Sequence, residues 1–360
     1  MKVWNYIIMA MALLVVFALS ETAMAKNIVL RSATYHPVQH YLTDDTYKTY
    51  GAEIEKRTNG RVKFTWFFGG TMLKVPQTVK GVRQGMADFS VAALYFEPQM
   101  FPITSILDLP FMLDNSLHGS LAAWRMYHEI PEMREEFEKA GLKPVAFFPT
   151  ASMELGMISE SITKLEQLKG KRIITPAPMS LEIFKALGAA PQLISPMDVY
   201  MALHRKMAEG ATFPVAPMRS FKLTDMLSKF TLPGFNNCMH AFLMSTKTWN
   251  KLPKDIQAVF TDIGKSAGAL AGTTLVNEGN WVKEELVKRG DTISKLTKKE
   301  KARWVAKCKP IRDAYVAKLN KLGYDGAGLY EKALAIADET RGQAYGPDSW
   351  WGNAGKKKNR

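Results

Sequence analysis

The sequence predicts an α/β fold in which two lobes are joined by hinge strands and by a long helix between the lobes. Three observations carry this prediction. Strand and helix patterns alternate in both halves of the chain, and a repeated β-α-β order favours a mostly parallel sheet with right-handed crossovers. The two sets of elements are joined twice, near residues 149–152 and again near residues 234–240. A long amphipathic segment then begins at Pro253.

The first half of the chain alternates short strands with helices that end at glycine. One helix ends at Asn59-Gly60 and the next at Gly85, because glycine enters the left-handed region without a Cβ clash. In order, the expected elements are strand 27–34, helix 41–57, strand 61–68, helix 75–84, strand 88–93, helices 116–127 and 131–140, and strand 143–148. We expect the first lobe to comprise residues 27–149 plus about 238–272.

The centre of the second half, residues 168–214, has the pattern of a compact β-α-β-α-β unit. Pro176 ends its first strand, because proline cannot donate to a strand ladder, and Gly188 closes its first helix. Ser195 caps the second helix, whose inner face carries four apolar residues: Val199, Ala202, Leu203 and Met207. The expected elements are strand 171–175, helix 180–187, strand 192–194, the capped helix and strand 210–213. In an open α/β sheet, such turns lead side chains into a crevice that can hold a ligand.

The remaining segments supply further strands and the C-terminal helices. A one-turn helix is capped at Thr163, and the other expected elements are strands 153–159, 229–232 and 238–245, a short helix 218–225 and a last helix 330–339. The helix from Pro253 should continue to Lys288, although four glycines would let it bend or break: Gly264, Gly268, Gly272 and Gly279. Thr297 caps the next helix, which Pro310 should kink. We expect the second lobe over 150–237 plus about 273–345.

The N-terminal segment, residues 1–25, has the composition of a secretory signal peptide. Lys2 precedes an apolar run over 7–18, which is shorter than the roughly 20 residues of a membrane span, and Ala23-Met24-Ala25 is a small-x-small cleavage site. We therefore expect an exported, periplasmic protein with cleavage near Ala25. An uncleaved N-terminal anchor is the alternative. No later stretch is long and apolar enough to span a bilayer.

The formal net charge is +14, from 48 Lys and Arg against 34 Asp and Glu. The excess is scattered over predicted helix surfaces, and part of it lies in a basic C-terminal tail, residues 346–360. No basic patch interleaved with stacking aromatics stands out, so nucleic acid is not an expected partner. The charge favours solubility and attraction to anionic surfaces.

No constellation in the sequence indicates catalysis, a cofactor or a metal site. The six histidines form no H-E-x-x-H pair, and there is neither a G-x-S-x-G elbow nor a glycine-rich phosphate loop. Cys238 with His240 is a weak candidate for a nucleophile and its base. Cys238 and Cys308 could form a disulfide in an oxidising compartment. Cys308 also falls on the apolar stripe of a predicted helix, where a buried thiol is equally at home.

Several segments together resemble the periplasmic solute-binding subunits of the tripartite, ATP-independent (TRAP) transporters. The segments LKGKRIITP, FKALGAAP, SPMDVYMAL and EGATFP follow one another in the order and spacing of that family. Earlier in the chain, EIEKRTNGRVKFTWFFGGTM, GVRQGMADFSVAA and ILDLPFML resemble other segments of the family. The resemblance covers nearly the whole mature chain. It implies a two-lobe periplasmic binding protein fold with the ligand between the lobes, and an ion-driven membrane permease as partner.

Three departures from the family pattern bear on the ligand. In the family, the strand after Leu-Lys-Gly carries an arginine that clamps the substrate carboxylate, and the matching position here is Ile174. A second basic position falls near Met153-Glu154, and the Asp-Gly-Gln-Glu-Asn-Pro run of the family appears as EGATFP. A guanidinium is the group best suited to a planar carboxylate. A C4-dicarboxylate is therefore not the expected ligand.

The family's cleft, carried over segment by segment, implies eight ligand-binding residues: Tyr35, His36, Thr71, Tyr95, Glu154, Ile174, Phe213 and Arg219. Aromatic side chains with one acid suit an amine-bearing, neutral or aromatic solute, through cation–π contacts and charge-assisted hydrogen bonds. Other interpretations stay open, since Glu154 and Arg219 are equally consistent with solvated surface residues. His36 fits a turn residue, and Ile174 and Phe213 fit the core.

The sequence therefore predicts a non-enzymatic protein that captures a small organic solute for a TRAP-type transporter. Two alternatives stay open: a periplasmic sensor or adapter of the same fold, and a secreted hydrolase. Closure of two lobes over a ligand gives a partner two states to distinguish, which suits transport and sensing alike.

Overall fold

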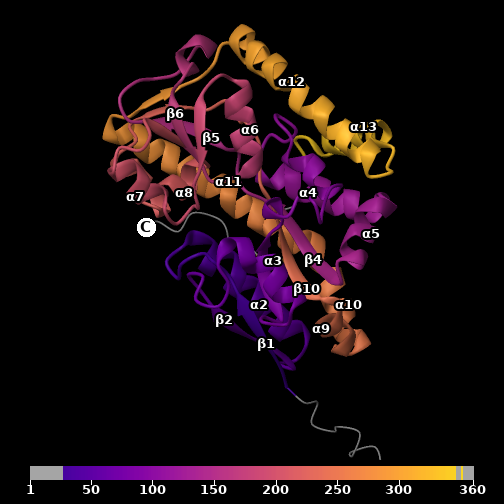
Figure 1. Ribbon diagram of the computed structural model, residues 1–360. Helices are drawn as coiled ribbons and strands as arrows, with labels where there is room; N and C mark the ends of the chain where they lie inside the picture. The colour runs from indigo at the N-terminus through magenta and orange to yellow at the C-terminus, as the bar shows by residue number, and fades with distance from the viewer. Residues whose placement is uncertain (1–26, 346–349, 352–360) are drawn as a thin grey trace, which may run out of the picture.

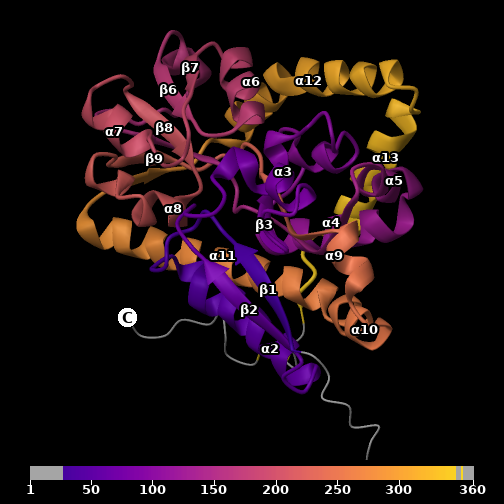
Figure 2. The same ribbon diagram turned by 60° about the horizontal axis from the view of Figure 1, so that its bottom comes forward.

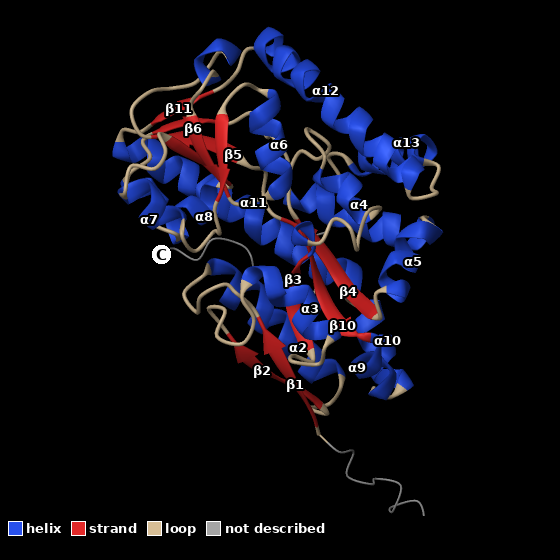
Figure 3. Ribbon diagram, in the orientation of Figure 1, coloured by secondary structure: helices blue, strands red, loops and turns tan. Residues whose placement is uncertain are grey.

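The chain folds into two lobes, each built around its own β-sheet, with one long helix, α11, running along both (Figure 1). The structure is a computed structural model that describes residues 27–345 and 350–351. The expected signal peptide, residues 1–25, and most of the expected tail, residues 346–360, lie outside the described residues. Figure 3 shows the strands gathered into two separate groups, with helices packed around each.

The first sheet has five strands in the order β2-β1-β3-β10-β4. β1 pairs in parallel with β2 and β3, whereas β10 is antiparallel to β3 and β4. The bounds are Ile28–Ala33 for β1, Val62–Phe67 for β2, Phe89–Ala93 for β3, Leu142–Pro149 for β4 and Met239–Ser245 for β10. The sequence predicted all five strands in the right places, two of them from alternation of apolar residues.

The second sheet has six strands in the order β11-β9-β5-β8-β6-β7. The bounds are Glu154–Met157 for β5, Arg172–Thr175 for β6, Ala190–Leu193 for β7, Gly210–Phe213 for β8, Lys229–Thr231 for β9 and Thr292–Ser294 for β11. β6 is parallel to β7 and β8, and β11 is parallel to β9, whereas β5 is antiparallel to β8 and β9. The three-residue β11 was not predicted, because it is too short to show alternation.

Both sheets are mixed, which corrects the expectation of mostly parallel sheets. The antiparallel strands are β5 and β10, the first strands after each passage between the lobes. β4 and β9 lead directly into β5 and β10 in the other sheet. A strand that starts at the hinge runs away from it, opposite to strands such as β3 and β8 that end there.

The two connections between the lobes run side by side, as the hinge prediction requires. The amide of Met153 donates to the Asn236 carbonyl at 2.7 Å, and the amide of Phe235 donates to the Met153 carbonyl at 3.0 Å. The amide of Thr150 donates to the Cys238 carbonyl at 2.9 Å. The expected double crossing is confirmed.

Shorter helices cover the outer faces of the two sheets (Figure 2). Their bounds are Thr49–Arg57 for α2, Thr78–Arg83 for α3, Ser116–Glu129 for α4, Pro131–Lys139 for α5, Pro178–Ala186 for α6, Val199–His204 for α7, Val215–Ser220 for α8, Thr246–Lys251 for α9 and Lys254–Asp262 for α10. Single turns and short irregular helices are η1 (Thr43–Lys48), η2 (Val75–Gln77), η3 (Leu94–Phe96), η4 (Thr104–Asp108), η5 (Leu165–Leu168) and η6 (Leu223–Asp225). Because α7 ends at His204, Met207 lies beyond it and is 42% exposed, which corrects its place in the inner stripe.

The helix expected from Pro253 is divided into α10 and α11 (Gly264–Arg289) at the first of its four glycines. Two of the glycines that follow, Gly268 and Gly272, serve close packing. A Cβ atom on Gly268 would lie 2.3 Å from the carbonyl oxygen of Phe147 in β4, and one on Gly272 would lie 2.6 Å from the Cα of Leu117 in α4. Because these glycines carry no side chain, the backbone of α11 lies directly against the first lobe. The same helix also contacts α8 and β11 of the second lobe.

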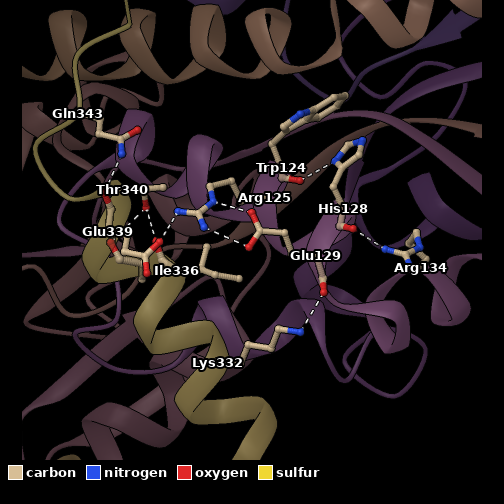
Figure 4. Close-up of polar contacts among 11 residues, drawn as sticks. Trp124, Arg125, His128, Glu129, Arg134, Lys332, Ile336, Glu339, Thr340 and Gln343 are labelled. Carbon is tan, nitrogen blue, oxygen red and sulfur yellow. Dashed lines mark hydrogen bonds and ion pairs between the residues drawn. The ribbon is translucent and has the colours of Figure 1, made fainter.

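The C-terminal helices α12 (Lys298–Lys321) and α13 (Gly326–Thr340) return the chain from the second lobe to the first. α12 contains Pro310 and packs on α6, whereas α13 packs on α4, although the sequence placed the whole of 273–345 in the second lobe. Figure 4 shows polar contacts at the α4–α13 interface: Arg125 bonds Glu129 at 2.7 Å and Glu339 at 2.8 Å, and Lys332 bonds the Glu129 carbonyl. No helix within the described ranges combines the length and apolar character needed to cross a bilayer.

The packing of α11 makes a prediction about two of its glycines. We expect Gly268→Ala to lower the free energy of unfolding by about 1–3 kcal/mol, because the added methyl group collides with the backbone of β4. Gly279→Ala is the matched control on the same helix, since a Cβ there meets nothing within 4 Å. It should raise stability by about 0.5–1 kcal/mol through helix propensity. Urea unfolding checks both values, and equal effects of the two substitutions would contradict the packing role of Gly268.

Candidate functional site

A cavity of about 50 Å³ lies between the lobes, with room for a few water molecules. Strands of both sheets end at it, since Tyr35 follows β1, Tyr95 follows β3 and Phe213 ends β8. Ligands of open α/β sheets occupy this position, outside the carboxyl ends of the strands. The lining residues are Tyr35, His36, Tyr41, Leu42, Tyr95, Phe148 and His240 from the first lobe, Pro176, Ala177, Pro196, Phe213, Pro214, Pro217 and Phe221 from the second, Thr150, Met153 and Cys238 from the connections, and Leu275 from α11.

The cavity wall is aromatic and proline-rich. None of its described lining residues is Asp, Glu, Lys or Arg. Pro176 and Pro214 follow directly on β6 and β8, where proline ends a strand because it has no N–H to donate. The wall therefore offers apolar surface and a small number of neutral polar groups.

His240 is held in one tautomer by two hydrogen bonds. Its Nδ1 lies 3.0 Å from the Cys238 carbonyl oxygen, and because a carbonyl only accepts, Nδ1 carries the proton. Nε2 is then an acceptor and receives a hydrogen bond from the Tyr35 hydroxyl at 2.8 Å. Phe148 stacks on the imidazole with the ring centroids 5.3 Å apart. Burial lowers the pKa of His240 to about 4, so the ring is neutral at pH 7.

Two more histidines lie beside this network and are also held neutral. The Nδ1 of His36 lies 2.8 Å from the Tyr47 hydroxyl, and the ring of His40 lies 4.3 Å from that of His36. Burial lowers the pKa of His36 well below its ordinary value, and the neighbouring His40 and His240 add to the fall. Burial alone lowers the pKa of His40 to about 3. Near pH 7 the cavity and its surroundings therefore carry no imidazolium.

The pairing of Cys238 with His240 does not make an activated nucleophile. Burial raises the pKa of the Cys238 thiol well above its ordinary value, and the nearby Asp108 raises it further. The thiolate that nucleophilic attack requires is therefore disfavoured. The Nε2 of His240, the only nitrogen left to act as a base, already accepts from Tyr35. Cys238 and Cys308 are both buried free thiols, so the disulfide that the sequence left open is not formed.

Tyr41 presents a polar atom without a partner at the cavity. Its hydroxyl is buried and makes no hydrogen bond with the described residues, although the side chain lines the cavity. A buried hydroxyl without a hydrogen-bond partner lowers the stability of the folded protein by about 1–3 kcal/mol. Such a group at a cavity wall is suited to bind a polar group of a ligand.

Four of the eight residues expected at the site come together at this cavity: Tyr35, His36, Tyr95 and Phe213. Three others lie away from it. Thr71 is exposed and its hydroxyl donates to the Phe68 carbonyl. Ile174 is fully buried in the core around β6. The guanidinium of Arg219 lies over the ring of Trp281, 4.1 Å from its centroid.

Glu154, the eighth expected residue, lines a different cavity of about 220 Å³ next to the connections between the lobes. Its carboxylate accepts a hydrogen bond from the Gly234 amide at 2.9 Å. Burial raises the pKa of Glu154 to about 8, partly offset by that hydrogen bond and by Lys283 and Lys301. Lys283 lines the same cavity. The expected acid therefore ties the two connections together and does not face the aromatic wall.

Among the cavity residues that sequence reasoning missed are Tyr41, Phe148 and His240, the last as a neutral hydrogen-bonding group. Tyr41 was assigned only to the start of a helix. Phe148 is the last residue but one of β4 and His240 is the second residue of β10. The signal that could have found them is their position beside the predicted crossings. Strand ends at a hinge face the cleft.

The neutral His240 makes the stability of the protein depend on pH. In the unfolded chain this histidine binds a proton below about pH 6.5, whereas in the folded protein it binds one only below about pH 4. The unfolded state therefore binds more protons between these two pH values, and the free energy of unfolding falls as the pH drops through this window. We expect this group to contribute a loss of about 2–3 kcal/mol between pH 7.5 and 4.5. His240→Gln should lack this part of the pH dependence in urea titrations at the two pH values. His204→Gln, at an exposed histidine, is the control and should follow the wild type. The same pH dependence in wild type and His240→Gln would contradict the prediction.

Comparison with known proteins places the chain in a family. Residues 32–319 match the model of the bacterial extracellular solute-binding protein family 7. A solute-binding protein of Sulfitobacter sp. (strain NAS-14.1) is 28% identical over 304 residues, which cover 83% of this chain and 90% of that protein.

Solved structures share the fold at lower identity. A marine metagenome TRAP solute-binding protein, described as specific for aromatic acid ligands and bound to 3-hydroxybenzoate, is 22% identical, with a TM-score of 0.82 over 88% of this chain and 99% of that one. A TRAP solute-binding protein from Rhodoferax ferrireducens, in complex with benzoate, is 19% identical, with a TM-score of 0.81 over 87% and 98%. The predicted two-lobe fold and the resemblance are thus confirmed. The chain belongs to the bacterial extracellular solute-binding protein family 7.

Proposed function

We propose that this protein captures one small solute with an aromatic or otherwise partly apolar body between its lobes and delivers it to the permease of a TRAP-type transporter. The carrying observation is the cavity where strand ends of both lobes converge on an aromatic wall without charged side chains. Aromatic rings bury large apolar areas and pack on one another with favourable geometry. The composition of the N-terminal segment supports export to the periplasm as the setting for this role.

A C4-dicarboxylate is a poor fit to this wall. Each carboxylate loses hydration on entering the cleft, which is costly unless a cation or several donors replace the water. At the position of the family's arginine stands Ile174, which is fully buried and supplies only apolar surface. The hydrogen-bonding groups of the described wall are neutral tyrosine, histidine and threonine side chains. They suit a ligand with few polar groups.

The ligands of the structural relatives support an aromatic body. Two of them hold 3-hydroxybenzoate and benzoate, and a third, from Bordetella bronchiseptica, holds mandelate. An amine-bearing solute has less support, because Glu154 bonds Gly234 and lines a separate cavity. We therefore place aromatic solutes ahead of amines and of dicarboxylates.

Entry of such a solute needs movement. A ring is larger than a few water molecules, so the lobes must part or the wall must rearrange before it can enter the 50 Å³ cavity. The paired connections at Thr150–Cys238 and Met153–Asn236 lie between the lobes, where a hinge acts. A closed form with ligand then differs from the open form, which lets a permease recognise the loaded state.

A ligand screen tests the proposed function. We expect 3-hydroxybenzoate, 3-hydroxybenzamide or a related aromatic compound to raise the melting temperature, whereas succinate does not. At 100 times its dissociation constant a ligand adds about 2.7 kcal/mol to the free energy of unfolding. Isothermal titration calorimetry on the positive compounds supplies the affinity and the stoichiometry of one. Tight binding of succinate with no response to any aromatic compound would contradict the proposal.

The unpartnered hydroxyl of Tyr41 should contact the solute. Tyr41→Phe should weaken binding of the tightest aromatic ligand about three- to tenfold, because a hydrogen bond contributes about 0.5–1.5 kcal/mol. Tyr50→Phe is the matched control, since the Tyr50 hydroxyl is also buried without a partner among the described residues but lies outside the cavity wall. It should leave the affinity unchanged. Equal affinities for the Tyr41→Phe variant and the wild type would remove Tyr41 from the binding site.

A further inference from the structure

A further cavity, distinct from the one that Glu154 lines, adjoins the aromatic cavity and reaches α12, and we call it the second cavity. Its volume is about 220 Å³, and it shares Tyr95, Ala177 and Cys238 with the wall of the first cavity. Tyr315 and Lys318 of α12 line it on the outer side. A solute that spans the two cavities must therefore contact these shared residues.

Lys318 is the one lysine among the described residues that line the second cavity. Its Nζ donates to the Pro98 carbonyl at 3.3 Å and lies 5.2 Å from the ring centroid of Tyr315. The side chain is half-buried and forms no ion pair with any described residue. Three other cations of α12 do form ion pairs: Arg303 with Glu166, and Lys309 and Arg312 with Asp313. Desolvation without a counter-charge lowers the pKa of Lys318.

The two carboxyl groups in the same wall do not serve as its counter-charge. Asp108 is buried and accepts from the Met239 amide at 2.8 Å, and burial raises its pKa well above the ordinary value, so that the neutral acid is favoured. Glu182 is exposed and pairs with Lys185 at 3.0 Å. The cavity thus presents one half-buried cation, largely apolar walls, a neutral acid and a carboxylate, Glu182, that is already paired with Lys185. That set fits a single anionic group carried on an apolar body.

We propose that Lys318 is the anion anchor of the ligand site, and that the solute is an aromatic monocarboxylate whose ring occupies the first cavity and whose carboxylate pairs with the Lys318 ammonium in the second. This inference rests on the proposed function and names the solute class. It moves the positive charge from β6, the strand that carries Ile174, to the helix α12. One cation balances one carboxylate, so a second carboxylate would remain unpaired against apolar walls.

Calorimetric titration with a matched pair of probes tests the proposal. 3-Hydroxybenzoate and 3-hydroxybenzamide share a ring and a hydroxyl and differ in charge. We expect Lys318→Met to weaken binding of the acid at least tenfold and to change binding of the amide less than twofold. Lys318→Arg should retain most of the affinity for the acid. Lys321→Met, at an exposed lysine on the same helix, is the control and should bind both probes like the wild type.

The outcomes separate the anchor from the proposed function. If wild type and Lys318→Met bind the acid equally well, Lys318 does not bind the carboxylate, and the proposed aromatic ligand site between the lobes is unaffected. If the wild type binds neither probe while succinate binds tightly, both the anchor and the proposed solute class are wrong. Melting temperatures of all variants show that each is folded, so a loss confined to the acid reports on the carboxylate alone.

Discussion

The close approach of α11 to β4 is the contact on which the two-lobe arrangement depends. Gly264 and Gly268 have no Cβ to collide with the carbonyl oxygens of Val145 and Phe147, so the helix backbone lies directly on the first lobe. The same 26-residue helix then contacts α8 and β11 of the second lobe. A hydrogen-bonded helix is stiff, so the contacts that fix the first turns of α11 also fix the direction in which its later turns run. Leu275, further along it, closes the cavity between the lobes.

That cavity is neutral because of burial and of fixed tautomers. Tyr35, His240 and the Cys238 carbonyl form a chain in which each proton has one acceptor, and desolvation keeps the imidazole uncharged. An aromatic wall of this kind binds through apolar area, and a charged end of a solute must find its partner elsewhere. We propose that Lys318, which lines the adjoining cavity, supplies it.

Much of the fold could be predicted because strand alternation and glycine or proline stops are local signals. The double crossing also followed from element order. The mixed sheets did not, since strand direction depends on which strands start at the hinge, and the exposure of Met207 followed from an early helix end. At the site, strand-end residues such as Tyr35 and Phe213 could be placed from segment likeness. Glu154 and Ile174 could not, because side-chain direction from a strand depends on register and on the opposite lobe.

The most direct test of the account is a crystal structure of the protein with the aromatic compound that stabilises it most. We expect a single molecule between the lobes, with its ring against Tyr35, Tyr95 and Phe213. A solute bound outside the interlobe cleft, or one whose ring makes no contact with that wall, would contradict it.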